Sequence, residues 1–111
     1  KRVFYAKNII FIDEKKAGMS RAAAVKALQA EGVEAAEYNL RLQHTYPIYS
    51  EEKWWRHMPV LPAEDSLPGC AEANRKAVLL PYFTSEQPEL IEQYGNAFEK
   101  VWAHRDSIAK T

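Results

Sequence analysis

The clearest pattern of apolar and polar positions lies in the last third of the chain. A short apolar run at residues 78–80 (Val-Leu-Leu) stops at Pro81, which cannot extend a helix or donate to a sheet. This run predicts a short buried strand. Beyond it, one set of residues recurs at steps of three and four, the period of an amphipathic helix. The set comprises Ile91, Tyr94, Phe98, Val101, Arg105 and Ile108.

The start of this long helix is predicted just after the strand. Thr84 or Ser85 supplies a side-chain oxygen for the first free backbone amides, and Pro88 suits the first turn. We place Phe98 at the centre of the buried stripe and Trp102 near its edge. Such a helix has to bury its stripe on the rest of the chain.

One glycine interrupts the predicted helix. Gly95 costs about 1 kcal/mol relative to alanine in a helix interior. Because glycine has no side chain, we expect that another stretch of backbone approaches the helix at this position.

The first part of the chain alternates between strand-like and helix-like patterns. Residues 3–12 are rich in β-branched and aromatic side chains, which predicts a strand. Ser20 can cap a helix over residues 21–31, and Gly32 is a natural left-handed terminator for it. Residues 33–38 predict a weaker second strand, so the first part reads as a βαβ-like unit.

The middle of the chain, residues 39–66, is less regular and contains three prolines. We expect no element there beyond a short helix at residues 51–57. A second short helix at residues 70–76 then leads into the strand at 78–80. The resulting order predicts one α+β domain over residues 1–111, with the helices packed on one face of a small sheet.

Composition narrows the class of protein. A chain of 111 residues is long enough for one domain with a modest core. Fifteen basic and fifteen acidic residues cancel to a net charge of zero, which argues against a nucleic-acid partner. No apolar run approaches the ~18 residues that cross a bilayer, so no membrane partner is expected. Cys70 has no partner for an intrachain disulfide, which favours the cytoplasm.

The beginning of the sequence bears on domain organisation. The chain starts at Lys1 rather than at methionine, and strand-like residues follow almost at once. We therefore expect a piece of a longer polypeptide.

Three histidines are the obvious reactive candidates, because imidazole titrates near neutral pH. His44, His57 and His104 are too far apart in sequence for a compact ligand spacing, and Cys70 stands alone, so no metal site is expected. His44 lies in the irregular stretch, where a polar side chain can point into a cleft. We interpret Cys70 as a buried apolar residue.

No familiar catalytic motif is present. The chain has no glycine-rich phosphate loop, no Gly-x-Ser-x-Gly elbow and no paired-carboxylate signature, so we expect no catalytic residue. The aromatic cluster Trp54-Trp55-Arg56 either stacks on a planar ligand or, more commonly, anchors packing.

Five segments nevertheless resemble one enzyme family in the right order. Residues 27–33 (Ala-Leu-Gln-Ala-Glu-Gly-Val) look like a helix end of the DegT/DnrJ/StrS family of PLP-dependent sugar aminotransferases. Residues 42–49 stand where that family has a "Leu-His-x-x-Pro-x-Tyr" stretch. Residues 67–72 resemble its proline-led helix, 78–83 its "Leu-x-Leu-Pro" strand and 94–101 its final helix. Gln43 departs from the family pattern, which has leucine before the histidine.

The resemblance implies a fragment of an aminotransferase that acts on a keto-sugar, commonly nucleotide-linked, or on a cyclic polyol. The fragment corresponds to the C-terminal small domain of a type I PLP fold. A larger domain of the same polypeptide, absent here, would carry the Schiff-base lysine and bind PLP. No cofactor is expected in this fragment itself, which should be inactive alone. His44, Gln43 and Arg41 would contact substrate, and the full-length enzyme would be a homodimer.

Two other classes of function remain open. The chain could be a free-standing α+β module that binds or senses a ligand, or an interaction domain that uses Trp54 and Trp55 to bind a protein. A missing large domain predicts an exposed apolar patch, including Tyr46 and Tyr49 as well as the two tryptophans.

Overall fold

The computed structural model describes residues 7–54, 56–57 and 67–110, which fall into two compact units. The sheet unit comprises Lys1–Tyr38 and Lys76–Thr111, and the loop unit comprises Asn39–Arg75. Predictions that concern residues 1–6 and Trp55 lie outside the described residues. Each unit is described by itself.

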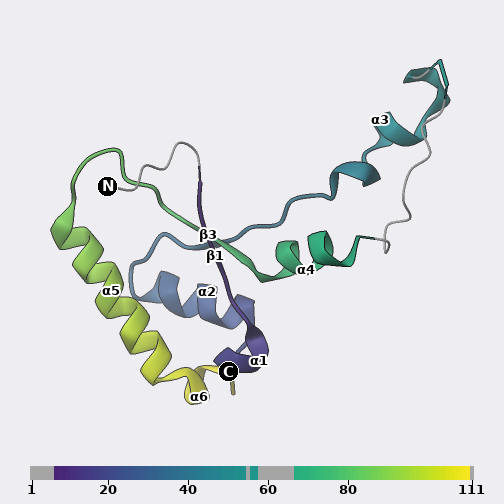
Figure 1. Cartoon of the computed structure of the whole chain (residues 1–111). Helices are drawn as coiled ribbons and strands as arrows, with labels where there is room; N and C mark the ends of the chain where they lie inside the picture. Colours follow the sequence, from purple (N-terminus) through teal and green to yellow (C-terminus); the bar gives the residue numbers. More distant parts are fainter. Residues whose placement is uncertain (1–6, 55, 58–66, 111) are drawn as a thin grey trace. The chain divides into compact units, whose positions relative to one another are not determined.

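The sheet unit is built on three antiparallel strands (Figure 1). They are β1 (Asn8–Phe11), β2 (Ala36–Glu37) and β3 (Ala77–Leu80), in the spatial order β1-β3-β2. Ile10 lies opposite Val78, and Ala36 lies opposite Leu79. Because β3 pairs antiparallel with both neighbours, β1 and β2 run in the same direction with β3 inserted between them. The α+β prediction is confirmed, and the predicted second strand is shorter than 33–38.

Two helices connect β1 to β2, and each begins at a side-chain cap. In α1 (Glu14–Ala17), Asp13 accepts hydrogen bonds from the amides of Lys15 and Lys16. The charged residues of this segment predict only a turn, and the structure forms one turn of helix there. In α2 (Arg21–Ala30), Ser20 Oγ accepts from the Ala23 amide at 3.1 Å, as predicted. Gly32 follows α2 with a φ of 86°, which confirms its left-handed conformation.

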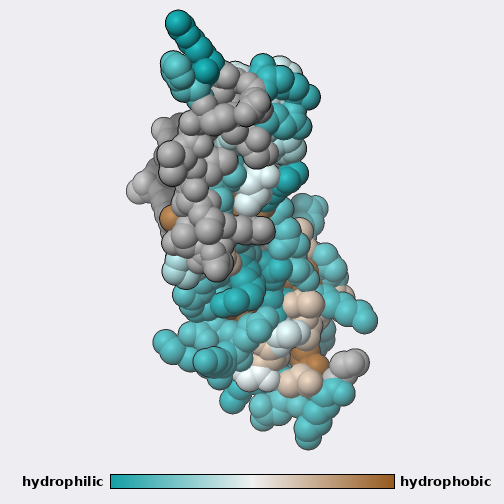
Figure 2. Space-filling model, turned by 90° about the vertical axis from the view of Figure 1, so that its right-hand side faces the viewer, coloured by the Kyte–Doolittle hydropathy of each residue, from teal (hydrophilic) through white to brown (hydrophobic). Residues whose placement is uncertain are grey.

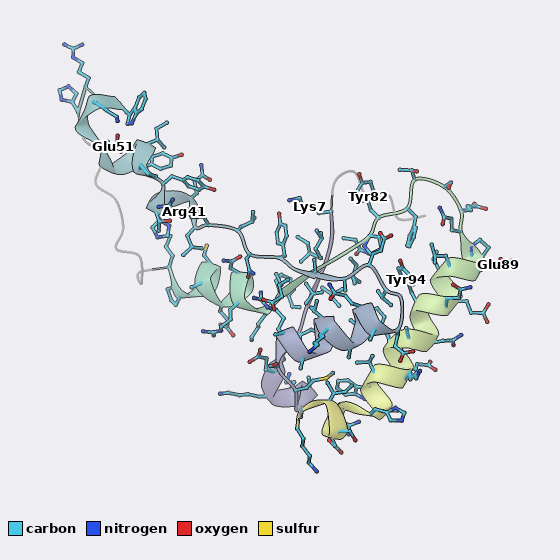
Figure 3. All side chains as sticks on the ribbon, turned by 180° about the vertical axis from the view of Figure 1, so that it is seen from behind. Lys7, Arg41, Glu51, Tyr82, Glu89 and Tyr94 are labelled. Carbon is cyan, nitrogen blue, oxygen red and sulfur yellow. The ribbon has the colours of Figure 1, made fainter. Side chains whose placement is uncertain are left out.

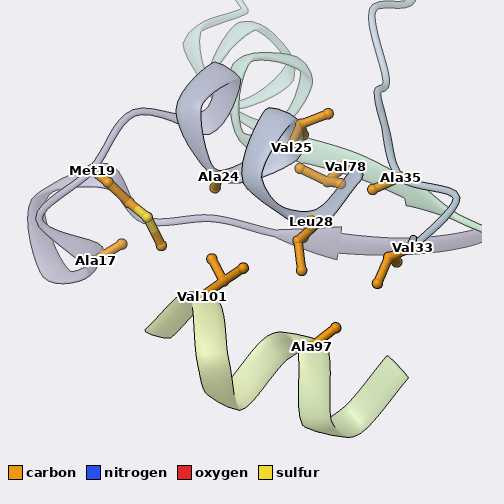
Figure 4. Packing of buried hydrophobic residues seen from close by; sticks show 10 residues of the cluster. All are labelled: Ala17, Met19, Ala24, Val25, Leu28, Val33, Ala35, Val78, Ala97 and Val101. Atoms are coloured by element: carbon orange, nitrogen blue, oxygen red, sulfur yellow. The ribbon is translucent and has the colours of Figure 1, made fainter. Parts of the chain in front are cut away.

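The core lies where α2, the sheet and the last long helix meet. Leu28 and Val78 are the largest fully buried side chains, with 1% and 0% exposure. In Figure 4, Leu28 of α2 and Val101 of the last long helix point toward each other. The cluster also contains Ala17, Met19, Ala24, Val25, Val33, Ala35 and Ala97. Eight of the ten residues are alanine or valine, so the core is built mainly from small side chains.

The sheet has one core face and one outer face. Ile10, Val78 and Leu80 pack in or against the core cluster. Because strand residues alternate between faces, their neighbours Ile9, Phe11 and Leu79 belong to the outer face. Phe11 is 63% exposed there. The core helices therefore pack on one face of the sheet.

The last long helix, α5 (Pro88–Ala103), is followed by the short α6 (Arg105–Ile108). Pro88 occupies its first turn as predicted, but Gln87 is the N-cap residue and no side chain caps the helix. The prediction of Thr84 or Ser85 is therefore wrong, because the bend after β3 delays the helix until the proline can start it.

The buried stripe of α5 is centred one position from the prediction. Ala97 and Val101 are its fully buried residues, whereas Phe98 and Tyr94 are partly buried against the core. Trp102 is 51% exposed, which fits its predicted place near the edge. The expected close approach at Gly95 is wrong, because a Cβ at that position would meet nothing within 4 Å.

The loop unit contains short elements and no buried side chain among its described residues. In chain order these are η1 (Gln43–Thr45), α3 (Pro47–Ser50), η2 (Glu52–Trp54) and α4 (Pro68–Lys76). Where we predicted a helix at 51–57, the described residues form only the single turn η2. The predicted helix at 70–76 is confirmed but starts earlier, at Pro68.

Candidate functional site

The loop unit contains a hollow of about 300 Å³ that has mainly apolar walls. Its lining residues are Leu42, Gln43, His44, Tyr49, Leu67 and Cys70. The first three come from η1 and the residue before it, Tyr49 comes from α3, and the last two come from the start of α4. Two segments more than 15 residues apart in sequence therefore form its walls.

Local hydrogen bonds hold the η1 wall in shape. Thr45 Oγ1 donates to the Leu42 carbonyl oxygen at 2.7 Å, and the Thr45 amide donates to the same oxygen at 3.0 Å. Pro47 then begins α3, where its missing N–H leaves no unsatisfied donor. The wall is thus a tight turn that leads directly into a helix.

Arg41, one of the predicted substrate contacts, does not line this hollow. Its guanidinium donates to the Thr45 carbonyl oxygen at 2.6 Å and to Thr45 Oγ1 at 3.2 Å. It also lies 5.2 Å from the centre of the Tyr46 ring, a cation–π distance. The structure therefore gives Arg41 a role in holding the η1 turn.

His44 does line the hollow, and its ring nitrogen Nε2 is the most informative atom in the site. Nε2 is buried, and no hydrogen-bond partner is present for it in the part of the chain that the structure describes. A buried polar atom without a partner costs about 1 to 3 kcal/mol. The nitrogen is closed to solvent, so a polar group of a ligand would reach it only if the η1 wall moved.

Gln43, the third predicted contact, is also a lining residue of the hollow. Gln43 Nε2 donates to the Tyr49 hydroxyl at 2.9 Å, which orients both side chains. The surface that faces the hollow is nevertheless almost entirely apolar.

Cys70 and Tyr49 were missed as site residues. The prediction that Cys70 is buried is wrong: its side chain is exposed and lines the hollow. The described side chains of the loop unit pack too loosely to enclose it. Helical periodicity gave no signal for Cys70 in α4 or for Tyr49 in α3, since nothing in one sequence tells which segments face each other across a loop.

The other two histidines lie outside the hollow. His57 is exposed. His104 follows α5, and its Nδ1 lies 2.9 Å from the Lys100 carbonyl oxygen at the end of that helix. A histidine at the negative end of a helix dipole is a common stabilising arrangement.

The described part of the aromatic cluster is solvent-facing. Trp54 is 58% exposed, its Nε1 donates to Glu51 Oε2 at 3.0 Å, and Lys53 lies 5.1 Å from its ring. We had expected a packing anchor, and within the described residues Trp54 does not act as one. Its indole remains open on one side.

Two further hollows lie in the sheet unit. One, of about 240 Å³, is lined mostly by core residues such as Met19, Leu28 and Phe98. The other, of about 340 Å³, lies beside Leu79 and Tyr82. Among the described residues, neither contains a buried polar atom that lacks a partner. The loop-unit hollow is therefore the stronger candidate site.

Comparisons with known proteins gave no match to a family model, a curated protein or a solved structure. Within the described ranges, no helix has the length and apolar character needed to span a membrane. No three histidine, cysteine or acidic side chains of that part of the chain gather as metal ligands would.

Proposed function

We propose that this chain is the C-terminal domain of a PLP-dependent aminotransferase that transfers an amino group to a keto-sugar or cyclic polyol. One observation carries the proposal. The two family-like segments 42–49 and 67–72, which are separate in sequence, supply the walls of one hollow. The two segments that carry the resemblance thus form one candidate substrate site.

The chemistry of the hollow suits part of a sugar. Its walls are almost entirely apolar and can pack on the C–H faces of a sugar ring. In our proposal the η1 wall shifts on binding, so that a ring hydroxyl reaches the buried His44 Nε2. A ligand hydroxyl at Nε2 would remove the cost of the unpaired nitrogen. This makes His44 the residue expected to distinguish a hydroxylated substrate from an apolar one.

The hollow does not fit PLP itself. Its lining contains no lysine to bind the aldehyde and no lysine or arginine to neutralise the phosphate. In our proposal PLP, which supplies the electron sink, is held by a large domain of the same polypeptide, and the present chain orients the substrate. The isolated chain would therefore not turn over.

Exposed apolar surface supports a missing partner domain. Phe11 on the outer face of the sheet is 63% exposed, and Tyr46 in the loop unit is 42% exposed. Figure 2 shows brown hydrophobic patches among the hydrophilic residues of the face that it draws. Such patches often mark an interface. We expect a homodimeric enzyme of the cytoplasm.

The proposal is tested on the full polypeptide that contains these residues. It should retain PLP after purification, and His44→Ala should raise the KM for the sugar acceptor about tenfold while PLP content stays unchanged. His57→Ala, an exposed histidine of the same unit, is the matched control and should leave KM unchanged. A full polypeptide that lacks a PLP-binding domain would overturn the proposal.

A protein-interaction domain is the second candidate, favoured by the exposed indole of Trp54. In that case Trp54→Ala would abolish binding to a partner protein, and His44→Ala would not. In the aminotransferase, by contrast, Trp54→Ala would leave PLP content unchanged. Measuring both His44→Ala and Trp54→Ala for partner binding and for the KM of the sugar acceptor separates the two candidate functions.

A further inference from the structure

Asn74 of α4 holds both backbone polar groups of Leu40. The Leu40 amide donates to Asn74 Oδ1 at 2.9 Å, and Asn74 Nδ2 donates to the Leu40 carbonyl oxygen at 2.7 Å. The side-chain amide thus bonds Leu40 as a neighbouring strand would. In Figures 1 and 3 the chain that enters the loop unit runs beside α4.

This pair closes the loop unit at its base. Leu40 and Asn74 are 34 residues apart in sequence, and joining the ends of so long a loop has an entropic cost. Burial offers little to offset that cost, because no described side chain of the loop unit is buried. Hydrogen bonds at the base therefore contribute a larger share of the free energy that keeps this unit folded than they would in a unit with a packed core.

The pair also sets which parts of the two walls face each other. Cys70 lies one helical turn before Asn74, so both side chains project from the same face of α4. His44 lies four residues after Leu40, at the far end of the same short stretch. Fixing Leu40 against Asn74 thus brings the His44 turn toward the α4 face that carries Cys70.

We propose that Asn74 is the positioning residue of the hollow, and that its two hydrogen bonds to Leu40 keep His44 in the lining. When they are absent, the stretch from Leu40 to His44 leaves α4 and Nε2 becomes accessible to water. This inference holds whatever the hollow binds, so it does not depend on the aminotransferase proposal.

The test compares Asn74→Ala with the neighbouring Arg75→Ala by hydrogen exchange in the 111-residue chain. Alanine favours a helix more than asparagine does, so Asn74→Ala does not weaken α4 itself. We expect the Leu40 amide to exchange about tenfold faster in Asn74→Ala and to be unchanged in Arg75→Ala. The hydrogen on the ring carbon between the two imidazole nitrogens exchanges slowly with solvent, at a rate that reports how accessible the ring is. In Asn74→Ala this hydrogen of His44 should exchange at a rate close to those of the exposed His57 and His104.

A graded variant guards against simple unfolding. Asn74→Asp keeps the oxygen that accepts from the Leu40 amide but loses the donor, so Leu40 should be protected to an intermediate degree. The amides of β1 and α5 should keep their protection in all variants. Unchanged exchange at Leu40 and His44 in Asn74→Ala overturns the proposal. The proposal is also overturned if both Asn74 variants lose protection against exchange equally at the amides of β1 and α5.

Discussion

At the scale of single residues, the stability of the sheet unit rests on a small core. Alanine and valine make up most of the buried cluster, and Leu28 is its largest fully buried residue from α2. Small side chains bury little area each, so one large residue in such a core contributes a large share. Leu28 belongs to this cluster and is only 1% exposed.

Leu28→Ala should therefore be severely destabilising. Truncating a buried leucine removes its transfer free energy and leaves a cavity, which together cost about 2 to 5 kcal/mol. That is a large part of the 5 to 15 kcal/mol typical of a small domain. Phe98→Ala should lower the free energy of unfolding by less than the truncation of a fully buried phenylalanine would, because Phe98 is only partly buried. Urea midpoints measure both, and the exposed Lys26→Ala is the control, expected to change stability by less than about 0.5 kcal/mol. Equal midpoints for Leu28→Ala and Lys26→Ala would contradict the core described above.

Asp13 predicts a defined pH dependence. The backbone hydrogen bond from Lys16, helped by the charges of Lys76 and Lys16 and the amide of Lys15, holds the pKa of Asp13 below its ordinary value although desolvation opposes the shift. Because the folded pKa is below the unfolded one, the contribution of Asp13 to stability is fully present above the unfolded pKa. It is lost as the pH falls through the lowered folded pKa.

Asp13→Asn provides the measurement. Asparagine still caps a helix but does not titrate in this range. The difference in unfolding free energy between the wild type and Asp13→Asn should shrink as the pH falls from neutral to below about 4, the ordinary aspartate range. A difference that stays constant over that range would show that the Asp13 carboxylate does not contribute through its charge.

At the scale of elements, two glycines should respond in opposite directions to the same substitution. Gly32 ends α2 with a φ of 86°, a conformation that a side chain disfavours. Gly95 lies inside α5 with no contact within 4 Å of an added Cβ. Gly32→Ala should therefore destabilise the chain by about 1 kcal/mol, and Gly95→Ala should stabilise it by up to about 1 kcal/mol. Thermal melts of the two variants decide it, and a loss of stability in Gly95→Ala would mean that a neighbour approaches α5 there.

The ends of a helix were predicted correctly where a single residue type determines them through contacts within one turn. Ser20 and Gly32 bounded α2 because a hydroxyl cap and a left-handed glycine act within a single turn. The N-terminus of α5 was predicted too early, because Thr84 is an equally good cap in isolation and only the course of the chain after β3 excludes it. The two-residue length of β2 likewise depends on its pairing with β3.

The ion pair between Arg21 and Glu37 could not be read from the sequence either. Arg21 donates to Glu37 Oε2 at 2.6 Å and to the Ala77 carbonyl oxygen at 3.2 Å, joining the start of α2 to β2 and β3. Only the sheet order β1-β3-β2 brings these residues together. In the same way, the family resemblance led us to His44 and Gln43, but only the tertiary structure adds Tyr49 and Cys70 to them.

At the scale of the whole molecule, the two units differ in what stabilises them. The sheet unit has a buried cluster of ten residues, whereas no described side chain of the loop unit is buried. Segments with little buried apolar surface open at a lower free energy than the global unfolding of a protein. The loop unit should therefore open locally while the sheet unit stays folded.

Hydrogen exchange at several urea concentrations, in the wild type and in Leu28→Ala, tests this difference. Amides bonded inside the loop unit, such as those of Thr45 and Tyr49, should exchange through openings that depend weakly on urea. Amides of β1 and β3 should exchange through global unfolding, with a strong dependence. Leu28→Ala should lower the opening free energy of the strand amides by the same amount as it lowers the free energy of unfolding. It should leave the loop-unit amides unchanged, because Leu28 belongs to the core of the other unit. If both sets of amides shift equally, the chain unfolds as one cooperative body, and the hollow around His44 then depends on the core as much as on its own hydrogen bonds.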